Sequence, residues 1–169
     1  MENIDWYIIN TKPCQEEIAK VNLESQNVEV YLPLYKKKIK KNKKKEEKIV
    51  PLFPGYLFAR FDLDTMFHKV SYTRGVKKIL FNRENVFTIS DEVIEAIKQR
   101  EEDGVVKLVS KNYEFKRGDR IIIDEGIFDG WEGVFYEETE DSERAVILLT
   151  NVKYSSKLIV PKKYITINK

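Results

Sequence analysis

The chain has 169 residues, with 30 lysines and arginines against 28 acidic residues, and nine tyrosines and nine phenylalanines. Its length suits one domain or two small ones, its aromatic content excludes a wholly disordered chain, and no run of about 20 apolar residues could form a transmembrane helix. The single cysteine, Cys14, excludes a disulfide framework, and the N-terminus lacks the basic and apolar regions of a signal peptide. We therefore expect a cytoplasmic protein without membrane contact.

Hydrophobic periodicity predicts an α+β first half. Strands are expected at residues 6–11, 28–34, 49–61 and 76–81, and helices at 13–26, 63–72 and from Ser90 onward. Ser90 suits a helix cap, and Val93, Ile94 and Ile97 would form the inner face of that helix. The result would be one sheet with helices packed against it.

The first helix has its own predicted start and inner face. Pro13 suits the first helical position, where its missing N–H costs nothing. Four residues recur at three- and four-residue spacing and predict one face of this helix: Cys14, Ile18, Val21 and Ser25.

Positive charge is concentrated in residues 36–48, which hold nine lysines and two glutamates. This tract is expected to form the distal part of a hairpin. A lysine block is often only a solvated segment, but a local patch can also steer a polyanion when the net charge is as low as +2. We favour contact with nucleic acid without sequence specificity, because lysine is a point charge and not a bidentate fork. The lysines assigned to this contact are Lys37, Lys38, Lys40, Lys41 and Lys43.

The segment that follows, residues 51–62, carries too many apolar groups for one pleated face. Phe53, Tyr56, Leu57, Phe58 and Phe61 cannot all point into one core from a continuous strand. On such a strand residues 54, 56 and 58 share one face, and residues 53, 55 and 57 share the other. We expect one face to close the core and the face of residues 54, 56 and 58 to be at least partly open to a partner.

The second half of the chain has a different pattern. Residues 102–113 mix charge without a clear period and are interpreted as a linker between a domain at 1–101 and a domain at 114–169. Short strands are expected at 119–124, 134–136, 144–152, 157–160 and 164–167, with a glycine-rich turn at 126–133. Short strands with glycine turns and no helix predict a small β-barrel.

No catalytic or metal site can be assembled from the chain. His68 and Cys14 are the only histidine and cysteine, so the roughly four ligands of a zinc site are missing. There is no phosphate loop, dinucleotide fingerprint or nucleophile elbow. The acidic pairs at 16–17 and 137–138 suit solvated surfaces. We expect a protein that is not an enzyme and that holds no metal and no cofactor.

Several segments, in their order and spacing, resemble the NusG family of transcription elongation factors. Trp6-Tyr7, the string Pro51-Leu-Phe-Pro-Gly-Tyr-Leu-Phe58 and Thr73-Arg74-Gly75-Val76 are similar to its N-terminal NGN domain. Gly118-Asp-Arg-Ile-Ile-Ile-Asp-Glu-Gly126, with Phe128 and Gly133, resembles the KOW motif. The aromatic string and residues 22–27 look closest to the specialised RfaH-like and LoaP-like members. The resemblance implies an antiparallel NGN sheet with flanking helices, linked to a small KOW β-barrel.

The resemblance also implies a function and its site residues. The chain would be a processivity and antitermination factor that suppresses pausing and termination by binding the clamp helices of the RNA polymerase β′ subunit. Residues matching the polymerase-binding positions are Tyr7, Phe53, Pro54, Tyr56 and Phe58. Residues matching positions that contact non-template DNA or a nascent RNA hairpin are Lys12, Gln26, Thr73 and Arg74. Phe128 and Trp131 would contact a ribosomal protein or Rho, and the protein would be a monomer.

Three alternatives stay open. Where RfaH-like members carry His-Thr-Thr for the polymerase β gate loop, this chain has Met66-Phe67-His68, and their recognition arginine aligns with Ser25. RfaH-like members also switch the C-terminal domain between a helical hairpin and a barrel; the β-branched residues of this half favour a permanent barrel. The competing function is a KOW-containing RNA-binding or ribosome-associated adaptor, which would have no use for the aromatic strand.

Overall fold

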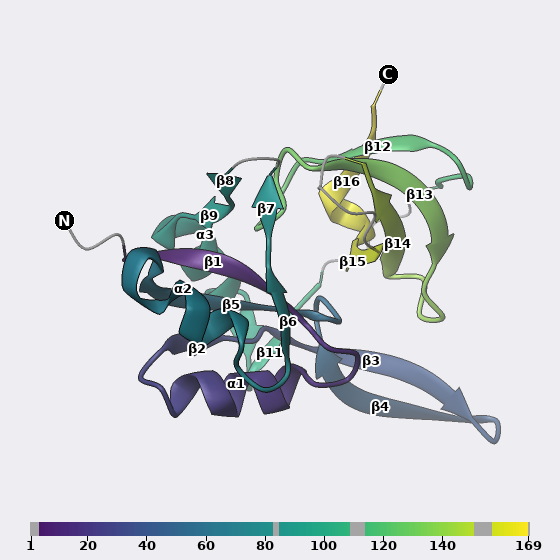
Figure 1. Cartoon of the computed structure of the whole chain (residues 1–169). Helices are drawn as coiled ribbons and strands as arrows, with labels where there is room; N and C mark the ends of the chain where they lie inside the picture. Colours follow the sequence, from purple (N-terminus) through teal and green to yellow (C-terminus); the bar gives the residue numbers. More distant parts are fainter. Residues whose placement is uncertain (1–3, 83–84, 109–113, 151–156, 169) are drawn as a thin grey trace.

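The computed structural model describes residues 4–82, 85–108, 114–150 and 157–168. These residues form two antiparallel sheets that pack against each other, together with three helices and a hairpin that projects from the body (Figure 1). None of the helices in these ranges is long and apolar enough to cross a membrane.

The first sheet has five antiparallel strands. Its order is β2-β5-β1-β6, and β9 pairs with β1 beside β6. The strand bounds are β1 (Ile4–Thr11), β2 (Glu29–Tyr31), β5 (Tyr56–Asp62), β6 (Val76–Ile79) and β9 (Thr88–Ile89). Two further short strands, β7 (Phe81–Asn82) and β8 (Asn85–Val86), pair with each other. The strands predicted at 6–11, 28–34 and 76–81 are therefore confirmed in their central parts, whereas the single strand predicted at 49–61 is divided between β4 (Lys44–Pro51) and β5.

Helices α1 (Glu16–Glu24) and α2 (Leu63–Ser71) cover one face of the first sheet. Alternate residues of the central strands face them, so Tyr7 and Ile9 of β1 share a core with Leu57 and Phe61 of β5. This arrangement confirms the prediction of one sheet with helices packed against it.

The inner face predicted for α1 was wrong. Its buried residues are Glu16, Ala19 and Leu23, whereas Ile18 and Val21 are exposed. Tertiary contacts select this face: Glu16 accepts a hydrogen bond from the Gly55 amide at 2.8 Å, and Ala19 lies under Gly75. The helix begins at Glu16 and not at Pro13. The residue after Pro13, Cys14, has a φ of 57°, which an α-helix cannot include.

Helix α3 (Asp91–Lys98) lies on the opposite face of the first sheet, with Ile94 and Ile97 buried as predicted. Ser90 occupies the N-cap position, but its side chain makes no capping hydrogen bond. The helix covers only part of this face, and the second sheet covers the rest.

The second sheet, called here the C-terminal sheet, has the order β15-β14-β13-β12-β16. Its strands are β12 (Arg120–Ile123), β13 (Glu132–Glu138), β14 (Arg144–Leu149), β15 (Lys157–Pro161) and β16 (Ile165–Ile167), with a 3₁₀ turn, η1 (Lys162–Tyr164), before β16. Across the described residues the edge strands β15 and β16 do not pair, so the predicted closed barrel is not formed. Residues 144–149 form a strand, as the β-branched sequence predicted, and not part of a helical hairpin.

A short hairpin follows α3. Strands β10 (Glu101–Glu102) and β11 (Val105–Val106) pair with each other, and β11 lies beside the base of the projecting hairpin. Val105 and Val106 are buried. The predicted linker therefore begins with structured residues, while residues 109–113 lie outside the described residues. The domain boundaries at 101 and 113 stay predictions.

Candidate functional site

The aromatic segment 51–62 is two elements and not one strand. Strand β4 (Lys44–Pro51) ends at the first residue of the segment. Gly55, with a φ of 86°, then forms a turn in which the Tyr56 amide donates to the Phe53 carbonyl, and β5 begins at Tyr56. The turn changes the expected faces. Phe53 joins Tyr56 and Phe58, whereas a continuous strand would have placed it with Leu57.

We call the resulting surface the aromatic face. It consists of Trp6 and Ile8 from β1, Tyr56 and Phe58 from β5, and Phe53 from the preceding turn. Register places Ile8 opposite Phe58, and directly opposed residues point to the same side of a sheet.

Phe128, in the turn between β12 and β13 of the C-terminal sheet, inserts into the aromatic face. Its ring centroid lies 5.1 Å from that of Phe53, 5.8 Å from Tyr56 and 6.3 Å from Phe58, each in an edge-on arrangement. Trp131 packs on Phe128 at 5.0 Å and on Phe87 at 4.3 Å. Of the two residues predicted to bind a second partner, Phe128 is thus buried against residues predicted to bind polymerase, and Trp131 is buried behind it.

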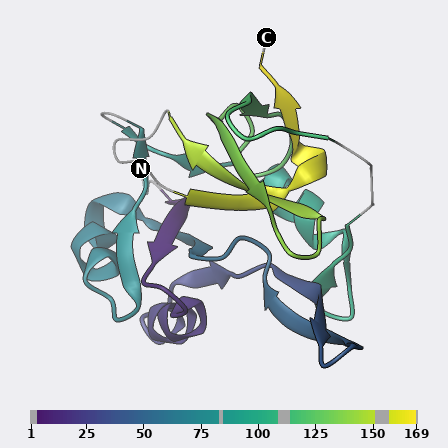
Figure 2. The same cartoon turned by 90° about the vertical axis from the view of Figure 1, so that its right-hand side faces the viewer.

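The prediction that this face is partly open was wrong for Tyr56 and Phe58, which are 2% and 0% exposed; only Pro54 is half-buried. The cause is the C-terminal sheet, whose folding onto this face the sequence pattern of 51–62 does not report. Figure 2 shows the green and yellow strands of this sheet next to the purple strand β1 of the first sheet. The Tyr56 hydroxyl also donates to the Lys157 carbonyl at 3.2 Å.

A polar cluster lies at one edge of the contact between the aromatic face and the C-terminal sheet. Arg144, buried in the C-terminal sheet, donates to the carbonyls of Pro51 and Leu52 at 3.3 and 3.2 Å and lies over the Tyr35 ring at 4.6 Å. The Tyr35 hydroxyl donates to Asp141 at 3.1 Å and to Glu143. These contacts join the base of the projecting hairpin to the C-terminal sheet.

Two pKa values reflect this burial. Burial, and then the hydrogen bond to Glu143, raise the pKa of the Tyr35 hydroxyl, so it stays a donor. Burial works against ionisation of Asp141, but hydrogen bonds from Thr139 and the Glu143 amide and the charge of Arg144 hold its pKa below the usual value. The cluster is therefore built around an ionised carboxylate.

A second polar contact joins the end of α3 to the C-terminal half of the chain. Arg100, just after α3, pairs with Glu125 at 2.6 Å and donates to the Tyr164 hydroxyl at 3.3 Å. The hydrogen bond to Glu125 raises the pKa of Arg100.

Tyr7 is not brought together with the other predicted polymerase-binding residues. It is buried on the helix-covered face, with its ring 4.8 Å from that of Phe61. The sequence reasoning missed Trp6 and Ile8, which lie on the aromatic face. Strand alternation could have found them, because residues 6 and 8 must face opposite to residue 7.

Four of the predicted nucleic-acid residues lie outside the lysine tract: Gln26, Thr73 and Arg74 lie together beside α1, and a backbone contact joins Lys12 to them. Gln26 donates to the Thr73 hydroxyl at 2.9 Å, and the Lys12 amide donates to the Gly75 carbonyl at 2.8 Å. Thr73 is buried and also donates to the Lys69 carbonyl, so its role here is to hold the turn. Lys12 and Arg74 are exposed. Tyr72, next to them, is 86% exposed and was not predicted.

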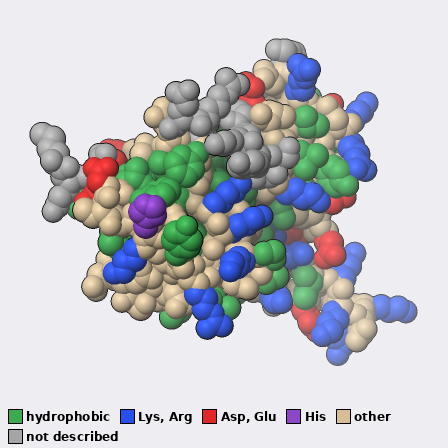
Figure 3. Space-filling model, in the orientation of Figure 1, with side chains coloured by type: hydrophobic (Ala, Val, Ile, Leu, Met, Phe, Trp, Pro, Cys, Tyr) green, Lys and Arg blue, Asp and Glu red, His purple; other side chains and the backbone are tan. Residues whose placement is uncertain are grey.

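The projecting hairpin, called here the lysine hairpin, consists of β3 (Leu34–Lys41) and β4. Its turn residues Asn42 and Lys43 both have positive φ, 50° and 64°, as a two-residue type I′ turn requires. Lysine side chains gather over this hairpin, at the lower right of Figure 3. The predicted distal hairpin is confirmed.

The register of the lysine hairpin sets like charges opposite each other. Lys37 pairs with Lys48, Lys40 with Lys45, and Lys41 with Lys44. Like charges directly opposite are destabilising in an antiparallel pair. At its base Lys36 pairs with Glu47 at 3.6 Å and Lys37 with Glu140 at 3.5 Å. Within the described residues, the distal lysines 40, 41, 43, 44 and 45 have no ion pair.

The described residues contain no group of three or more histidine, cysteine or acidic side chains that could hold a metal ion.

Comparison with known proteins points to one family. Residues 4–98 match the family model described as "NusG: Transcription termination factor nusG". Relatives include the transcription termination/antitermination proteins NusG of Chlamydia trachomatis and Chlamydia muridarum, each 28% identical over 159 residues covering 86% of this chain and 84% of the relative.

Solved structures with weaker likeness are those described as domain interaction in Thermotoga maritima NusG and as an MjSpt4:Spt5 complex in conformation A. The first is 21% identical with a TM-score of 0.42, covering 99% of this chain and 98% of that one. The second is 15% identical with a TM-score of 0.30, covering 97% and 98%.

Proposed function

Because the chain belongs to the NusG family of transcription termination and antitermination factors, we propose that it binds RNA polymerase through the aromatic face and acts as a processivity factor. The proposed site is the β′ clamp helices, and the proposed contact residues are Phe53, Pro54, Tyr56 and Phe58, with Trp6 added. A bound factor that bridges the main channel would hold the clamp closed and favour the elongating state, a population shift that needs no chemistry.

The observation that carries this proposal is that the aromatic face is apolar and is covered by elements that could move away from it. The face is almost wholly apolar, and the described residues cover it with α3 and a separate sheet from the second half of the chain. Clustered aromatic side chains that pack edge-on to a partner residue are typical of docking surfaces. A polymerase segment of similar apolar character could replace Phe128 in the same pocket.

We call the arrangement in which the C-terminal sheet covers the aromatic face the closed state, and the arrangement in which it has moved off this face the open state. Polymerase can bind the aromatic face only in the open state. The C-terminal sheet and the polymerase would compete for the aromatic face, so the apparent affinity falls with the fraction of molecules that are open. Opening would also release Phe128 and Trp131, which we propose as contacts for a second partner, such as a ribosomal protein or Rho. Polymerase docking and second-partner binding would then be available in the same state.

Nucleic acid would contact two surfaces outside the aromatic face. The first is the exposed pair Lys12 and Arg74 beside Gln26, and the second is the lysine hairpin. Non-template DNA and a nascent RNA hairpin are both possible targets of these cations, and each would be bound mainly through phosphates.

The test is polymerase binding by a Tyr56→Ala, Phe58→Ala variant in pull-down with core polymerase. We expect binding to be lost, with circular dichroism reporting whether the strands persist. Exchange of Tyr7, buried on the other face, for Phe serves as the control and should leave binding unchanged. A variant that folds and still binds polymerase would contradict docking through Tyr56 and Phe58, whereas a wild-type chain that does not bind polymerase would favour the alternative of an RNA-binding or ribosome-associated adaptor.

A further inference from the structure

Two turns lie on either side of the end of β1. Strand β1 runs between β5 and β6 in the first sheet. The Gly55 turn (residues 53–55) comes directly before β5, and the Gly75 turn (residues 73–75) comes directly before β6. The first turn belongs to the aromatic face proposed for polymerase, and the second carries Arg74, which is proposed for nucleic acid. The end of β1 therefore lies between the two proposed contact surfaces.

The Gly55 turn is held by three hydrogen bonds from residues 10–16. The Asn10 side-chain amide and the Thr11 backbone amide each donate to the Gly55 carbonyl at 2.8 Å. The Gly55 amide donates to the Glu16 carboxylate at 2.8 Å. Glu16 is buried, and burial of a carboxylate is costly unless such partners are in place. Both polar groups of this glycine are therefore bonded to one short segment.

The Gly75 turn is held by the same part of the chain. The Lys12 amide donates to the Gly75 carbonyl at 2.8 Å. A Cβ on Gly75 would lie 2.7 Å from the Ala19 backbone nitrogen, so the turn packs directly on α1. Just after α1, Gln26 donates to the Thr73 hydroxyl at 2.9 Å. One short segment and one helix thus contact both turns.

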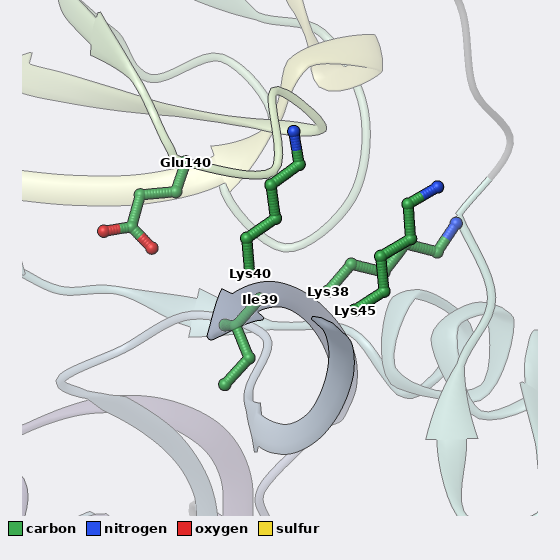
Figure 4. Close-up of a pocket in the computed structure, with 5 residues that line it drawn as sticks. All are labelled: Lys38, Ile39, Lys40, Lys45 and Glu140. Atoms are coloured by element: carbon green, nitrogen blue, oxygen red, sulfur yellow. The ribbon is translucent and has the colours of Figure 1, made fainter. Parts of the chain in front are cut away.

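The lysine hairpin, the other proposed nucleic-acid surface, lacks this link. In the described residues its two strands pair with each other and with no strand of the first sheet. Figure 4 shows the hollow beside this hairpin and the five residues that line it: Lys38, Ile39, Lys40, Lys45 and Glu140. The cations of the hairpin lie at the ends of flexible side chains on a projecting element. Of the two surfaces, the Gly75 turn is therefore the one whose position is fixed relative to the aromatic face.

We infer that Asn10 and Glu16 are positioning residues, which fix the spacing between the Gly55 turn and the Gly75 turn so that polymerase and nucleic acid contact one rigid unit. This inference rests on the proposed function and deepens it by naming the residues that align its two contact surfaces. The rigid unit lies within the first half of the chain and does not include the C-terminal sheet.

A fixed spacing has a measurable consequence for affinity. Once the Gly55 turn is docked, contact with nucleic acid held by the same polymerase becomes an intramolecular step. The effective concentration for that step is high only where the geometry allows both contacts at once. Turns that are fixed before binding also lose less conformational freedom on binding. Loosening one turn should therefore weaken the combined contact more than docking alone.

The test compares two affinities of the full chain by biolayer interferometry. One is measured on immobilised core polymerase alone, and the other on core polymerase assembled on a DNA bubble with a short RNA. Their quotient, called here the scaffold ratio, measures how much the nucleic acid adds to docking. Circular dichroism reports the folding of each variant. Acrylamide quenching of Trp6 and Trp131, both buried in the contact between the sheets, reports any change in the closed state.

Glu16→Ala leaves the Gly55 amide without its acceptor and should lower the scaffold ratio by about three- to tenfold, as expected for one lost hydrogen bond. Glu16→Gln keeps an acceptor oxygen at the same place and should keep the wild-type ratio. Glu17→Ala is the matched control, because Glu17 is exposed and its loss removes the same charge from the first turn of α1. This control should also keep the wild-type ratio.

Asn10→Ala provides a second variant, since it leaves the backbone bond from Thr11 to Gly55 in place. It should also lower the scaffold ratio, and it is the deciding variant if Glu16→Ala does not fold.

Four results would overturn the inference. The first is an unchanged scaffold ratio in the folded alanine variants, and the second is a wild-type chain whose two affinities are equal. The third is a Glu16→Gln ratio as low as that of Glu16→Ala, because the charge and not the hydrogen bond would then matter. The fourth is a ratio that falls only together with increased quenching, which would assign the effect to the closed state. A wild-type chain that binds neither form of polymerase would contradict the proposed function itself, and the inference with it.

Discussion

Arg144 shows how a single residue can hold two sheets together. The residue is 2% exposed, and its guanidinium donates to two backbone carbonyls of the first half and lies over the Tyr35 ring. Burial lowers its pKa, but the neighbouring Asp141 carboxylate favours the charged form. A buried charge of this kind is costly unless its partners are in place, so it fixes the geometry of closure.

We predict that Arg144→Met weakens closure by about 2 kcal/mol, because hydrogen bonds from a charged donor are lost. Acrylamide quenching of the tryptophans should increase. Arg120→Met changes an exposed arginine of β12 and should have no such effect. Unchanged quenching of the Arg144 variant would show that the polar cluster does not hold the sheets.

Gly75 fixes the turn that carries Arg74 against α1. Its φ is 90°, and a Cβ there would lie 2.7 Å from the Ala19 backbone nitrogen. Gly104 has a similar φ of 78° but no atom within 4 Å of such a Cβ. Alanine at either position would suffer backbone strain, but only alanine at Gly75 would also overlap a neighbouring atom. Comparing the two substitutions therefore measures the steric overlap at Gly75.

We predict that Gly75→Ala lowers the free energy of unfolding by more than Gly104→Ala, whose cost should be about 1 kcal/mol. Urea unfolding of both variants provides the comparison. Equal losses would mean that α1 shifts freely and does not position this turn.

At the scale of elements, the lysine hairpin gives a prediction about salt. Neutralising Lys40, Lys41, Lys43 and Lys44 to Gln removes four cations that have no ion pair within the described residues. Affinity for nucleic acid should fall, and the slope of log K against log salt should flatten by roughly the number of phosphates that these lysines neutralise. An unchanged slope would make the hairpin a solvated element. Stability should not fall, because two like-charged cross-strand pairs disappear.

The elements themselves could be predicted from sequence, but several of their faces could not. Periodicity located β1, α2, α3 and the lysine hairpin, because each follows a local rule. The inner face of α1 was predicted wrongly because Glu16 and Ala19 are buried by contacts with Gly55 and Gly75, which are distant in sequence. Phe53 was placed on the wrong face because β4 ends at Pro51 and Gly55, with a positive φ, forms a turn before β5. Each error comes from a tertiary contact or a single backbone angle that the pattern does not contain.

At the scale of the whole molecule, the two predicted partner surfaces are packed against each other. Phe128 fills the aromatic face, so the residues proposed for polymerase and for a second partner are buried in one core. The sequence pointed to both sets separately, but it could not show that they meet. The closed state is therefore a property of the assembled chain and not of either sheet.

Closure gives a prediction about Phe128. Truncation of a buried phenylalanine costs about 3–5 kcal/mol, and here much of that cost falls on the closed state. Phe128→Ala should therefore open the chain and increase tryptophan quenching. Val146→Ala, a half-buried residue of β14 outside the contact between the sheets, is the matched control.

Polymerase affinity of the Phe128→Ala chain is the most direct measurement of the central claim. The claim is that the aromatic face docks on polymerase and that the C-terminal sheet competes for it. It predicts that Phe128→Ala binds core polymerase at least about tenfold more tightly than the wild-type chain, while Val146→Ala does not. Weaker or equal binding by a Phe128→Ala chain whose tryptophans have become accessible would contradict it.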